Sequence, residues 1–348
     1  MVDTTPALGK APQRGPFAWL GAFTGFYPAE AAEFAHLDPV TRFLYASRSV
    51  ILVISAQAAV IAGLLALTDR RLGVVALVLL LLGYLVLHAI SNLSNDYFGH
   101  RRGHDTADSP RRRYTLHPIA SGAVTPRLLA VGVAVLGVLA AAIAVYFIAL
   151  RGWPAVLLTV VGATLLYAYD AAPRALKELG LGELAAFAVW GPLMIGGGYY
   201  VITGVSSGDA YLASLPYGLG VASILIGKHI DQRAFDTSQD QRTLPVLLGA
   251  AGARVLNQLV VAGMYLLTLV AVLLGALSPF ALLVVLAAPR ARHAWQVMAR
   301  PAPDQPPAGY VGWPLWYHRV CLMHNRLFGW VFILGIAIGA LVPSWRLG

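Results

Sequence analysis

Two stretches of this sequence concentrate side chains that can bind a metal ion and phosphate. The first, "SNLSNDYFGHRRGHDTADSPRRRY", begins at Ser91 and carries three aspartates among five arginines. The second, "GKHIDQRAFDTSQDQRTLPVLLG", begins at Gly227 and repeats aspartate three times within ten residues. Carboxylates are ligands for Mg²⁺, and arginine donates paired hydrogen bonds to phosphate oxygens. The two stretches therefore indicate a site for a magnesium-bound diphosphate.

The first stretch begins inside a hydrophobic segment. His88, Asn92 and Asp96 recur every four residues, so they share one face of a helix, and Asn95 lies beside them. Charged and amide side chains are costly within a membrane span, and they usually face the bundle interior or a wet cavity. The alternative is a helix end that enters the membrane interface, with Asn and Asp as caps.

The second stretch closes another hydrophobic segment. Asp236 and Asp240 are four residues apart and share a helical face, and Asp231 lies three residues after Lys228. The two acid-rich helix ends are expected to reach the same membrane face. The alternative is a pair of solvated loops whose charges neutralise one another.

Other polar residues give weaker signals. Arg48, near the inner end of the first span, is either a snorkelling anchor or a contact to phosphate or substrate. Lys177 and Tyr169 alone are typical of a positive-inside charge and an interfacial tyrosine. The segment "WPLWYHRVCLMHNR", residues 313–326, favours an aromatic and basic interfacial anchor. The single cysteine, Cys321, excludes an intrachain disulfide.

The composition predicts an all-α membrane protein that positions these residues. The chain of 348 residues is 58% hydrophobic and only 12% charged, against roughly 25% charged residues in soluble domains. About 20 apolar residues are needed to cross a bilayer. That criterion predicts nine transmembrane helices, at 43–67, 73–97, 127–150, 153–170, 182–204, 211–230, 252–275, 277–297 and 323–343. Residues 1–41 are expected to form a cytoplasmic or interfacial extension, and residues 42–348 the transmembrane domain.

The basic residues predict the orientation of the helices. A net charge of +9 would suggest a nucleic-acid partner in a soluble protein, but here the positive-inside effect explains it, so no nucleic acid is expected. With a cytoplasmic N-terminus, 21 of the 25 Lys and Arg residues fall on the inner side. The outer segments hold the other four: Arg70, Arg71, Arg151 and Arg346. Both acid-rich stretches are then cytoplasmic.

Four segments together resemble a known family. They are "NLSNDYFGHRRGHD" (92–105), "HPIASGAVTP" (117–126), "YDAAPRALKELGLGELAAFAVWGPLMIGGGYYVITG" (169–204) and "DQRAFDTSQDQRTLPVLLG" (231–249). In this order they resemble the UbiA superfamily of intramembrane prenyltransferases, and most of all the menaquinone-branch 1,4-dihydroxy-2-naphthoate prenyltransferases. The resemblance extends over about residues 42–343, which include nearly all the predicted spans.

The resemblance implies a nine-helix bundle in a bacterial-type plasma membrane, with a central cavity open toward the bilayer. Mg²⁺ held by both Asp-rich motifs would bind a prenyl diphosphate, and the allylic carbocation would pass to an aromatic, quinone-precursor-like acceptor. Such a protein is a prenyltransferase that transfers alkyl or aryl groups other than methyl. The chemistry fits the sequence, because cationic groups stabilise the departing diphosphate and apolar helices exclude water.

The resemblance also implies roles for particular residues. The metal ligands would be Asp96, Asp105, Asp231 and Asp236. Catalytic roles would fall to Asp96 and Asp236 and to Lys177 and Tyr169, which match positions near the diphosphate and the acceptor. Substrate contacts would come from a further set: Arg48, Asn92, Asn95, Arg101, Arg102, Lys228 and Arg242.

Two departures from the family pattern keep other functions open. Gly99 stands where the first motif has its next aspartate, and a glycine cannot bind a cation. In the second motif Asp231 and Asp236 are five residues apart instead of four, so Gln232 occupies the expected position. Asp108 or Asp240 could compensate. A UbiA-type terpene cyclase and an inactive lipid-diphosphate-binding relative are therefore alternatives, whereas a transporter is disfavoured because no inverted repeat is evident.

Overall fold

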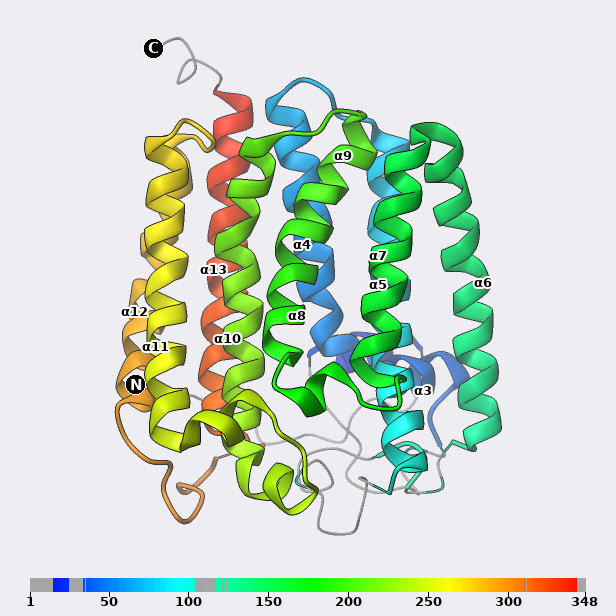
Figure 1. Cartoon of the computed structure of the whole chain (residues 1–348), viewed down its shortest axis with the longest axis vertical. Coiled ribbons are helices and arrows are strands. Elements are labelled where there is room, and N and C mark those ends of the chain that lie inside the picture. The colour runs from blue at the N-terminus through cyan, green and yellow to red at the C-terminus, as the bar shows by residue number, and fades with distance from the viewer. Residues whose placement is uncertain are drawn as a thin grey trace.

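Helices make up all regular structure in the described part of the chain (Figure 1). The computed structural model describes residues 15–24, 34, 36–103, 110, 117–120, 122, 124–310 and 312–342. The long helices are α4 (Ser49–Thr68), α5 (Val74–Arg101), α6 (Pro126–Arg151), α7 (Trp153–Asp170), α10 (Gly208–Ser238), α11 (Leu244–Leu273) and α13 (Tyr317–Leu341). The short segments are α1 (Pro16–Thr24), α3 (Pro39–Ala46), η2 (Leu176–Leu179), α8 (Gly182–Ala188), η3 (Val189–Gly196), α9 (Gly197–Thr203), η4 (Pro279–Ala287) and α12 (Ala288–Met298).

The expected fold class, an all-α membrane protein, is confirmed. Among the described residues, eight helical runs are long and apolar enough to cross a bilayer, counting α8, η3 and α9 as one run. The predicted fourth span matches α7 at both ends. The predicted eighth span, 277–297, instead divides into the 3₁₀ segment η4 and the short helix α12. Pro289 lies at this division and lacks the N–H that would continue a regular helix. The count of nine spans stays a prediction.

The predicted first span, 43–67, begins differently from the expectation. The chain forms α3, breaks at Arg48 and then starts α4. Arg48 adopts a left-handed conformation with φ of 55°, which interrupts the helix. The sequence placed Arg48 inside the span, and that placement was wrong, because the residue is the N-cap of α4. The predicted boundary between residues 41 and 42 falls within α3, so the division of the chain into two parts stays a prediction.

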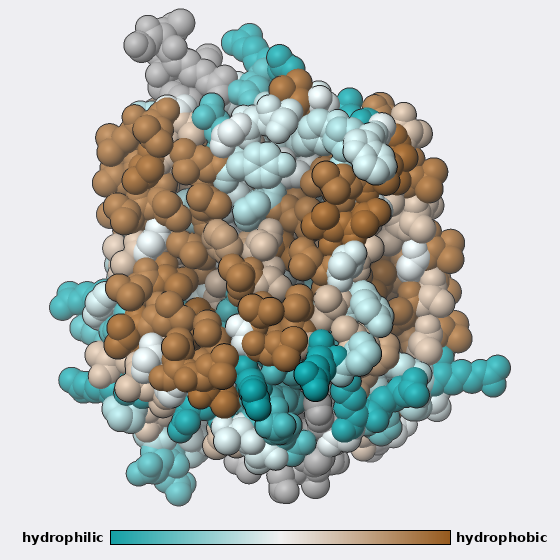
Figure 2. Space-filling view, in the orientation of Figure 1, coloured by the Kyte–Doolittle hydropathy of each residue, from teal (hydrophilic) through white to brown (hydrophobic). Residues whose placement is uncertain are grey.

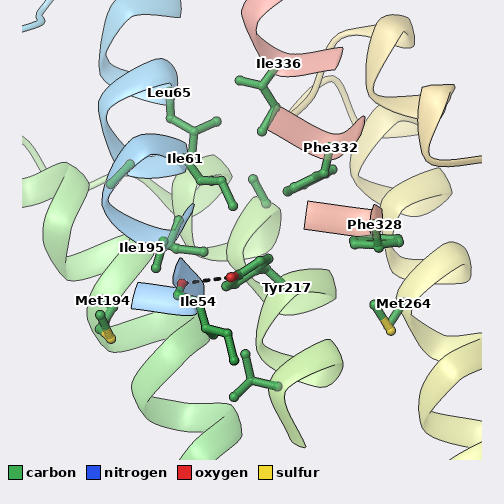
Figure 3. Close-up of a cluster of buried hydrophobic side chains, with 14 of the residues drawn as sticks. Ile54, Ile61, Leu65, Met194, Ile195, Tyr217, Met264, Phe328, Phe332 and Ile336 are labelled. Carbon is green, nitrogen blue, oxygen red and sulfur yellow. Dashed lines mark hydrogen bonds between the residues drawn. The ribbon is translucent and has the colours of Figure 1, made fainter. Parts of the chain in front are cut away.

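The core lies where α4, η3, α10 and α13 meet (Figure 3). Tyr217 of α10 is fully buried there, and its hydroxyl donates to Ile54 O over 2.8 Å. Close approach of the helices depends on glycine. A Cβ at Gly218 would lie 2.8 Å from Phe187 O and 3.0 Å from Gly191 Cα, so glycine at this position lets α10 pack closely against α8 and η3. Small residues at helix crossings are typical of membrane bundles.

The fifth membrane run contains a π-helical segment, η3, between α8 and α9. Pro192 lies inside it and cannot donate a backbone hydrogen bond. Tyr84 of α5 donates its hydroxyl to Met194 O over 2.6 Å, which provides a partner for a carbonyl in the irregular segment. In a membrane such carbonyls need a partner from a neighbouring helix. The irregular turn is therefore anchored to α5.

The surface separates into an apolar band and polar ends. Figure 2 shows hydrophobic residues over most of the visible face and hydrophilic residues gathered mainly at its lower end. The C-terminal ends of α5 and α10 both lie at this lower end (Figure 1). Packing is uneven across the bundle. In the most apolar stretch of α10, 72% of the residues are buried, against 11% in the corresponding stretches of α6 and α7. Large apolar side chains such as Val138 and Leu157 are exposed on α6 and α7, as expected for helices that contact lipid.

Candidate functional site

A large cavity runs through the bundle, as the sequence led us to expect. Its volume is about 1670 Å³, larger than the roughly 300–1,000 Å³ of ordinary small-molecule pockets. Side chains of α4, α5, α6, α7, η3, α10 and α13 line it, and most of them are apolar. The polar lining includes five of the predicted residues: Arg48, Asn92, Asn95, Tyr169 and Lys228. The cavity therefore joins a hydrophobic chamber to the polar ends of the helices.

The end of α5 is held by an ion pair. Arg48 donates through Nη2 to Asp96 Oδ1, and the side chain of Asp96 is 0% exposed. A buried carboxylate is stable only when it is paired. Arg48 Nε is buried without a hydrogen-bond partner among the described residues. One turn earlier, Asn92 donates through Nδ2 to Ser47 O over 2.8 Å. The break between α3 and α4 thus faces the polar end of α5.

A second charged pair lies beside the first. Asn95 Nδ2 donates to Asp170 Oδ1 over 2.9 Å, and Lys177 Nζ lies 2.6 Å from the same oxygen. Asp170 closes α7 and is 1% exposed, and its Oδ2 is buried without a partner among the described residues. Lys177 is therefore close to the predicted first motif. Sequence reasoning missed Asp170, although an acid at the end of an apolar span was a usable signal.

The segment η2 connects the two predicted motifs. Arg102, at the end of α5, contacts Glu178 of η2 over 2.9 Å. The carbonyl oxygen of Glu178 accepts the backbone N–H of Arg242 over 3.0 Å. Gly182 permits the tight return of the chain, since a Cβ there would lie 3.0 Å from Lys177 Cα. These contacts hold η2 against the ends of both acid-rich stretches.

The end of α10 carries its acids differently. Asp236 is 4% exposed, and its Oδ2 accepts the Thr243 hydroxyl over 3.2 Å. Asp231 accepts the backbone N–H groups of Tyr317 and His318, each over 2.9 Å. These amides belong to the first turn of α13, so Asp231 caps that helix from a neighbouring one.

A further acid was not anticipated. Glu183, at the start of α8, lies 2.7 Å from His229 Nδ1 of α10, and both side chains are buried. Glu183 Oε2 has no hydrogen-bond partner among the described residues. The sequence offered only the acid in "LGLGE" as a signal, because the pairing with His229 depends on how α8 packs against α10.

The donor set fits Mg²⁺ in chemical type. Asp96, Asp236, Asp170 and Glu183 provide hard carboxylate oxygens at the polar end, and one oxygen each of Asp170 and Glu183 has no partner in the described structure. No group of three or more His, Cys, Asp or Glu side chains is assembled for a metal within the described residues. Gly99 is buried on α5 and provides no ligand. Asp105, a predicted ligand, lies outside the described residues.

Two predicted substrate contacts point to the surface. Arg101 is exposed, with its guanidinium 5.8 Å from the centre of the Tyr97 ring. Arg242 is also exposed, and its described contact is through the backbone. Arg48 and Asn95 thus line the cavity, and Lys177 lies beside Asn95 because both contact Asp170. The two exposed arginines are outside the cavity lining.

The sequence is similar to a family model and to named proteins over much of its length. A model of the UbiA prenyltransferase family matches residues 56–320. The 1,4-dihydroxy-2-naphthoate octaprenyltransferase of Bacillus subtilis (strain 168) is 25% identical over 264 residues, which cover 74% of this chain and 80% of that protein. The 2-carboxy-1,4-naphthoquinone phytyltransferase of Synechocystis sp. is 32% identical over 156 residues, which cover 43% and 50%.

Solved structures share the fold. A UbiA homolog from Aeropyrum pernix K1 superposes with a TM-score of 0.59 at 23% identity, over 84% of this chain and 98% of that one. A UbiA homolog from Archaeoglobus fulgidus, bound to GPP and Mg²⁺, gives 0.52 at 17% identity, over 82% and 98%. The predicted resemblance is confirmed, and so is the class of enzyme, a prenyltransferase of alkyl or aryl groups other than methyl. By the match over most of its length, this chain belongs to the UbiA prenyltransferase family.

Proposed function

We propose that this protein transfers a prenyl group from a prenyl diphosphate to an aromatic, naphthoate-like acceptor within the membrane, with Mg²⁺ as cofactor. The observation that carries the proposal is the cavity, an apolar chamber whose polar lining includes Arg48 and Asn95. These two side chains contact the buried carboxylates of Asp96 and Asp170. Support for the acceptor comes from the relatives, which are named for naphthoate and naphthoquinone substrates.

The polar end would hold the diphosphate. Arg48 has an unpartnered Nε, and Lys177 and Lys228 add positive charge near the same end. Asp96 and Asp236 would hold Mg²⁺, with Asp105 and Asp231 completing the proposed set. Bound Mg²⁺ would neutralise charge on the leaving diphosphate. Asp231 would have to share its oxygens with the amides of α13.

The polar end and the apolar walls of the cavity would serve different steps of the reaction. The allylic carbon–oxygen bond breaks, and its electron pair leaves with the diphosphate, where Arg48 and Lys177 stabilise the developing charge. The apolar walls exclude water, which would otherwise capture the carbocation. A ring carbon of the acceptor then forms a bond to the prenyl carbon, and that ring carbon loses a proton or carbon dioxide. Tyr169 lines the cavity and would contact the substrates there.

Product analysis with purified protein tests the proposal. The protein in detergent is given Mg²⁺ and a series of prenyl diphosphates, with and without 1,4-dihydroxy-2-naphthoate. A prenylated ring together with diphosphate release only when the acceptor is present is the expected result. Diphosphate release without acceptor would indicate a cyclase. Magnesium-dependent binding without turnover would indicate an inactive relative, for which the missing carboxylate at Gly99 is the structural reason.

The polar end is proposed to face the cytoplasm of a bacterial-type plasma membrane, because basic residues concentrate there. Single-cysteine variants can test this, since the native Cys321 is fully buried. Ser206 and Ser238 are exposed residues at opposite ends of α10. In intact cells an impermeant thiol reagent should label Ser206→Cys and spare Ser238→Cys. The reverse pattern would invert the proposed topology.

A further inference from the structure

Three helices meet at a polar cluster on the cavity wall. Trp190 Nε1 of η3 donates to Ser55 Oγ of α4 over 3.0 Å, and Ser55 Oγ lies 2.8 Å from His88 Nδ1 of α5. The His88 and Trp190 rings meet edge to face, with 5.2 Å between their centroids. All three residues line the cavity. His88 precedes Asp96 by eight residues, which places it about 12 Å deeper along α5.

The hydrogen bonds suit the tautomer of His88 that carries its proton on Nε2. The indole N–H of Trp190 can only donate, so Ser55 Oγ accepts it and keeps its own hydrogen to donate. His88 Nδ1, 2.8 Å away, can accept that hydrogen. A neutral imidazole then carries its proton on Nε2. In this tautomer the Nε2–H of His88 is a donor for a cavity ligand.

This donor is poorly matched to an isoprenoid chain. The walls around it are apolar, including Ile51, Ile54 and Leu87. A hydrocarbon occupant would leave the Nε2–H without an acceptor, which is unfavourable in a dry site. A ring that carries an oxygen satisfies the donor and also packs against the exposed part of Trp190. The cluster is thus better suited to the acceptor than to the prenyl tail.

The backbone gives an independent indication. Trp190 lies in the π-helical segment η3, and the Tyr84 hydroxyl donates to Met194 O of the same segment. Single π-helical turns in otherwise regular helices occur frequently at functional sites. A regular helix would rotate Trp190 relative to Ser55 and His88. The irregular turn is consistent with a backbone shaped to place this indole on the cavity wall.

We propose that Ser55, His88 and Trp190 form the subsite that holds the oxygen-bearing ring of the aromatic acceptor, with His88 Nε2 donating to a ring oxygen. This inference rests on the proposed function for the identity of the ligand. Ser55 and Trp190 position the imidazole, and His88 is the group that touches the acceptor. The prenyl chain occupies the remaining apolar part of the cavity.

Substitutions of His88 separate the two ring nitrogens. In His88→Gln the amide nitrogen reaches the position of Nε2, whereas in His88→Asn it reaches only that of Nδ1. The KM for 1,4-dihydroxy-2-naphthoate should rise roughly tenfold in His88→Asn and His88→Leu, as for one lost hydrogen bond, and less in His88→Gln. The KM for the prenyl diphosphate should stay within about twofold. Equal acceptor KM values in all three variants would overturn the proposal.

Binding measurements keep the test independent of turnover. Calorimetric titration with 1,4-dihydroxy-2-naphthoate should show weaker binding in Trp190→Leu, and unchanged binding in the control Trp295→Leu, whose side chain is exposed on α12. Two simpler aromatic ligands show which oxygen of the acceptor His88 contacts. If His88 contacts a ring hydroxyl, His88→Leu weakens the binding of 1,4-dihydroxynaphthalene. If His88 contacts the carboxylate, His88→Leu weakens the binding of 2-naphthoate instead.

The outcomes distinguish this inference from the proposed function. If the wild-type protein transfers no prenyl group but binds the aromatic ring in a His88-dependent way, the proposed transfer fails and the subsite stands. If it transfers normally, and the variants lose only thermal stability, the cluster is merely a contact between helices and the inference is wrong. A rise in the KM for the prenyl diphosphate alone would assign the cluster to the chain and also overturn it.

Discussion

The two acid-bearing helix ends differ in what their carboxylates meet. At the end of α5, Asp96 pairs with Arg48, and the neighbouring Asn95 joins the pair formed by Asp170 and Lys177. The acids in this region are therefore bound to cationic side chains. The carboxylates are buried, and so a change of partner there alters both charge balance and stability.

At the end of α10 the described partners are neutral donors. Asp236 accepts the hydroxyl of Thr243, and Asp231 accepts two amides of α13. The two ends are therefore suited to complementary tasks. The α5 end combines carboxylates with cations that can contact a diphosphate, and the α10 end adds carboxylates for the metal ion that accompanies it.

Removing one carboxylate from each end should have the largest effect. Asp96→Ala and Asp236→Ala should each lower turnover by at least about a hundredfold, because each removes a ligand of the charged site. The loss of stability should differ between the two variants. Asp96→Ala leaves Arg48 without its described partner and should cost roughly 3–5 kcal/mol, whereas Asp236→Ala loses one hydrogen bond and about 1 kcal/mol.

Turnover assays and thermal unfolding of both variants provide the measurement, with Asp96→Asn as a near-isosteric companion. Full activity in either alanine variant would remove that residue from the site. Equal losses of stability would contradict the difference between the two ends.

The pair between Lys177 and Asp170 can be tested by rescue. Lys177→Met should destabilise the protein by a few kcal/mol, because it leaves the Asp170 carboxylate buried without its cation. A second change, Asp170→Asn, should restore much of that stability, since the acid is then neutral. Binding of a prenyl diphosphate should stay weak in the double variant. Restored binding together with restored stability would mean that Lys177 only supports the fold.

Asp231 should show a smaller effect on turnover than Asp236. Asp231→Asn keeps one acceptor for the α13 amides, so the loss of stability should be about 1 kcal/mol. Turnover should fall by roughly tenfold, less than in Asp236→Asn, because Asp231 shares its oxygens with two amides. Steady-state rates of the two Asn variants decide this. A loss as large as in Asp236→Asn would make Asp231 an equal metal ligand.

The exposed arginine at the rim should matter least. Arg101→Gln should change the KM for the prenyl diphosphate by no more than about twofold, since solvent screens an exposed charge. Arg48→Gln is the matched variant inside the cavity and should weaken the same substrate by about tenfold or more. If the two variants behave alike, burial does not distinguish the arginines that touch substrate.

Much of the fold was predictable because the bilayer imposes simple requirements. The length of apolar runs located α7 at both ends, and it located α6 and the run Gly182–Thr203 to within one residue. The polar ends of α10, α11 and α13 extend beyond the predicted spans, because hydropathy does not register a helix that continues out of the apolar run. The break at Arg48 was not predictable, because a left-handed residue depends on contacts beyond its own sequence. The division of 277–297 into η4 and α12 had a visible cause in Pro289, although the hydropathy of the stretch hid it.

The site was predictable in part. Acids in apolar segments are costly, and that argument identified Asp96 and Asp236, which the structure places in buried positions at one end of the bundle. Partners could not be derived in the same way. Asp170 and Glu183 were missed, because their pairings with Lys177 and His229 arise when α7, α8 and α10 pack together. His88 was recognised on the polar face of α5, but its link to Trp190 required the π-helical turn.

The central claim is that both acid-bearing ends hold one metal–diphosphate group, and binding can test it directly. The affinity for geranyl diphosphate is measured with and without Mg²⁺ in the wild type, in Asp96→Asn, in Asp236→Asn and in the double variant. One shared site predicts that either single change removes most of the gain from Mg²⁺, and that the double variant loses little more. Independent losses that add in the double variant would contradict the claim.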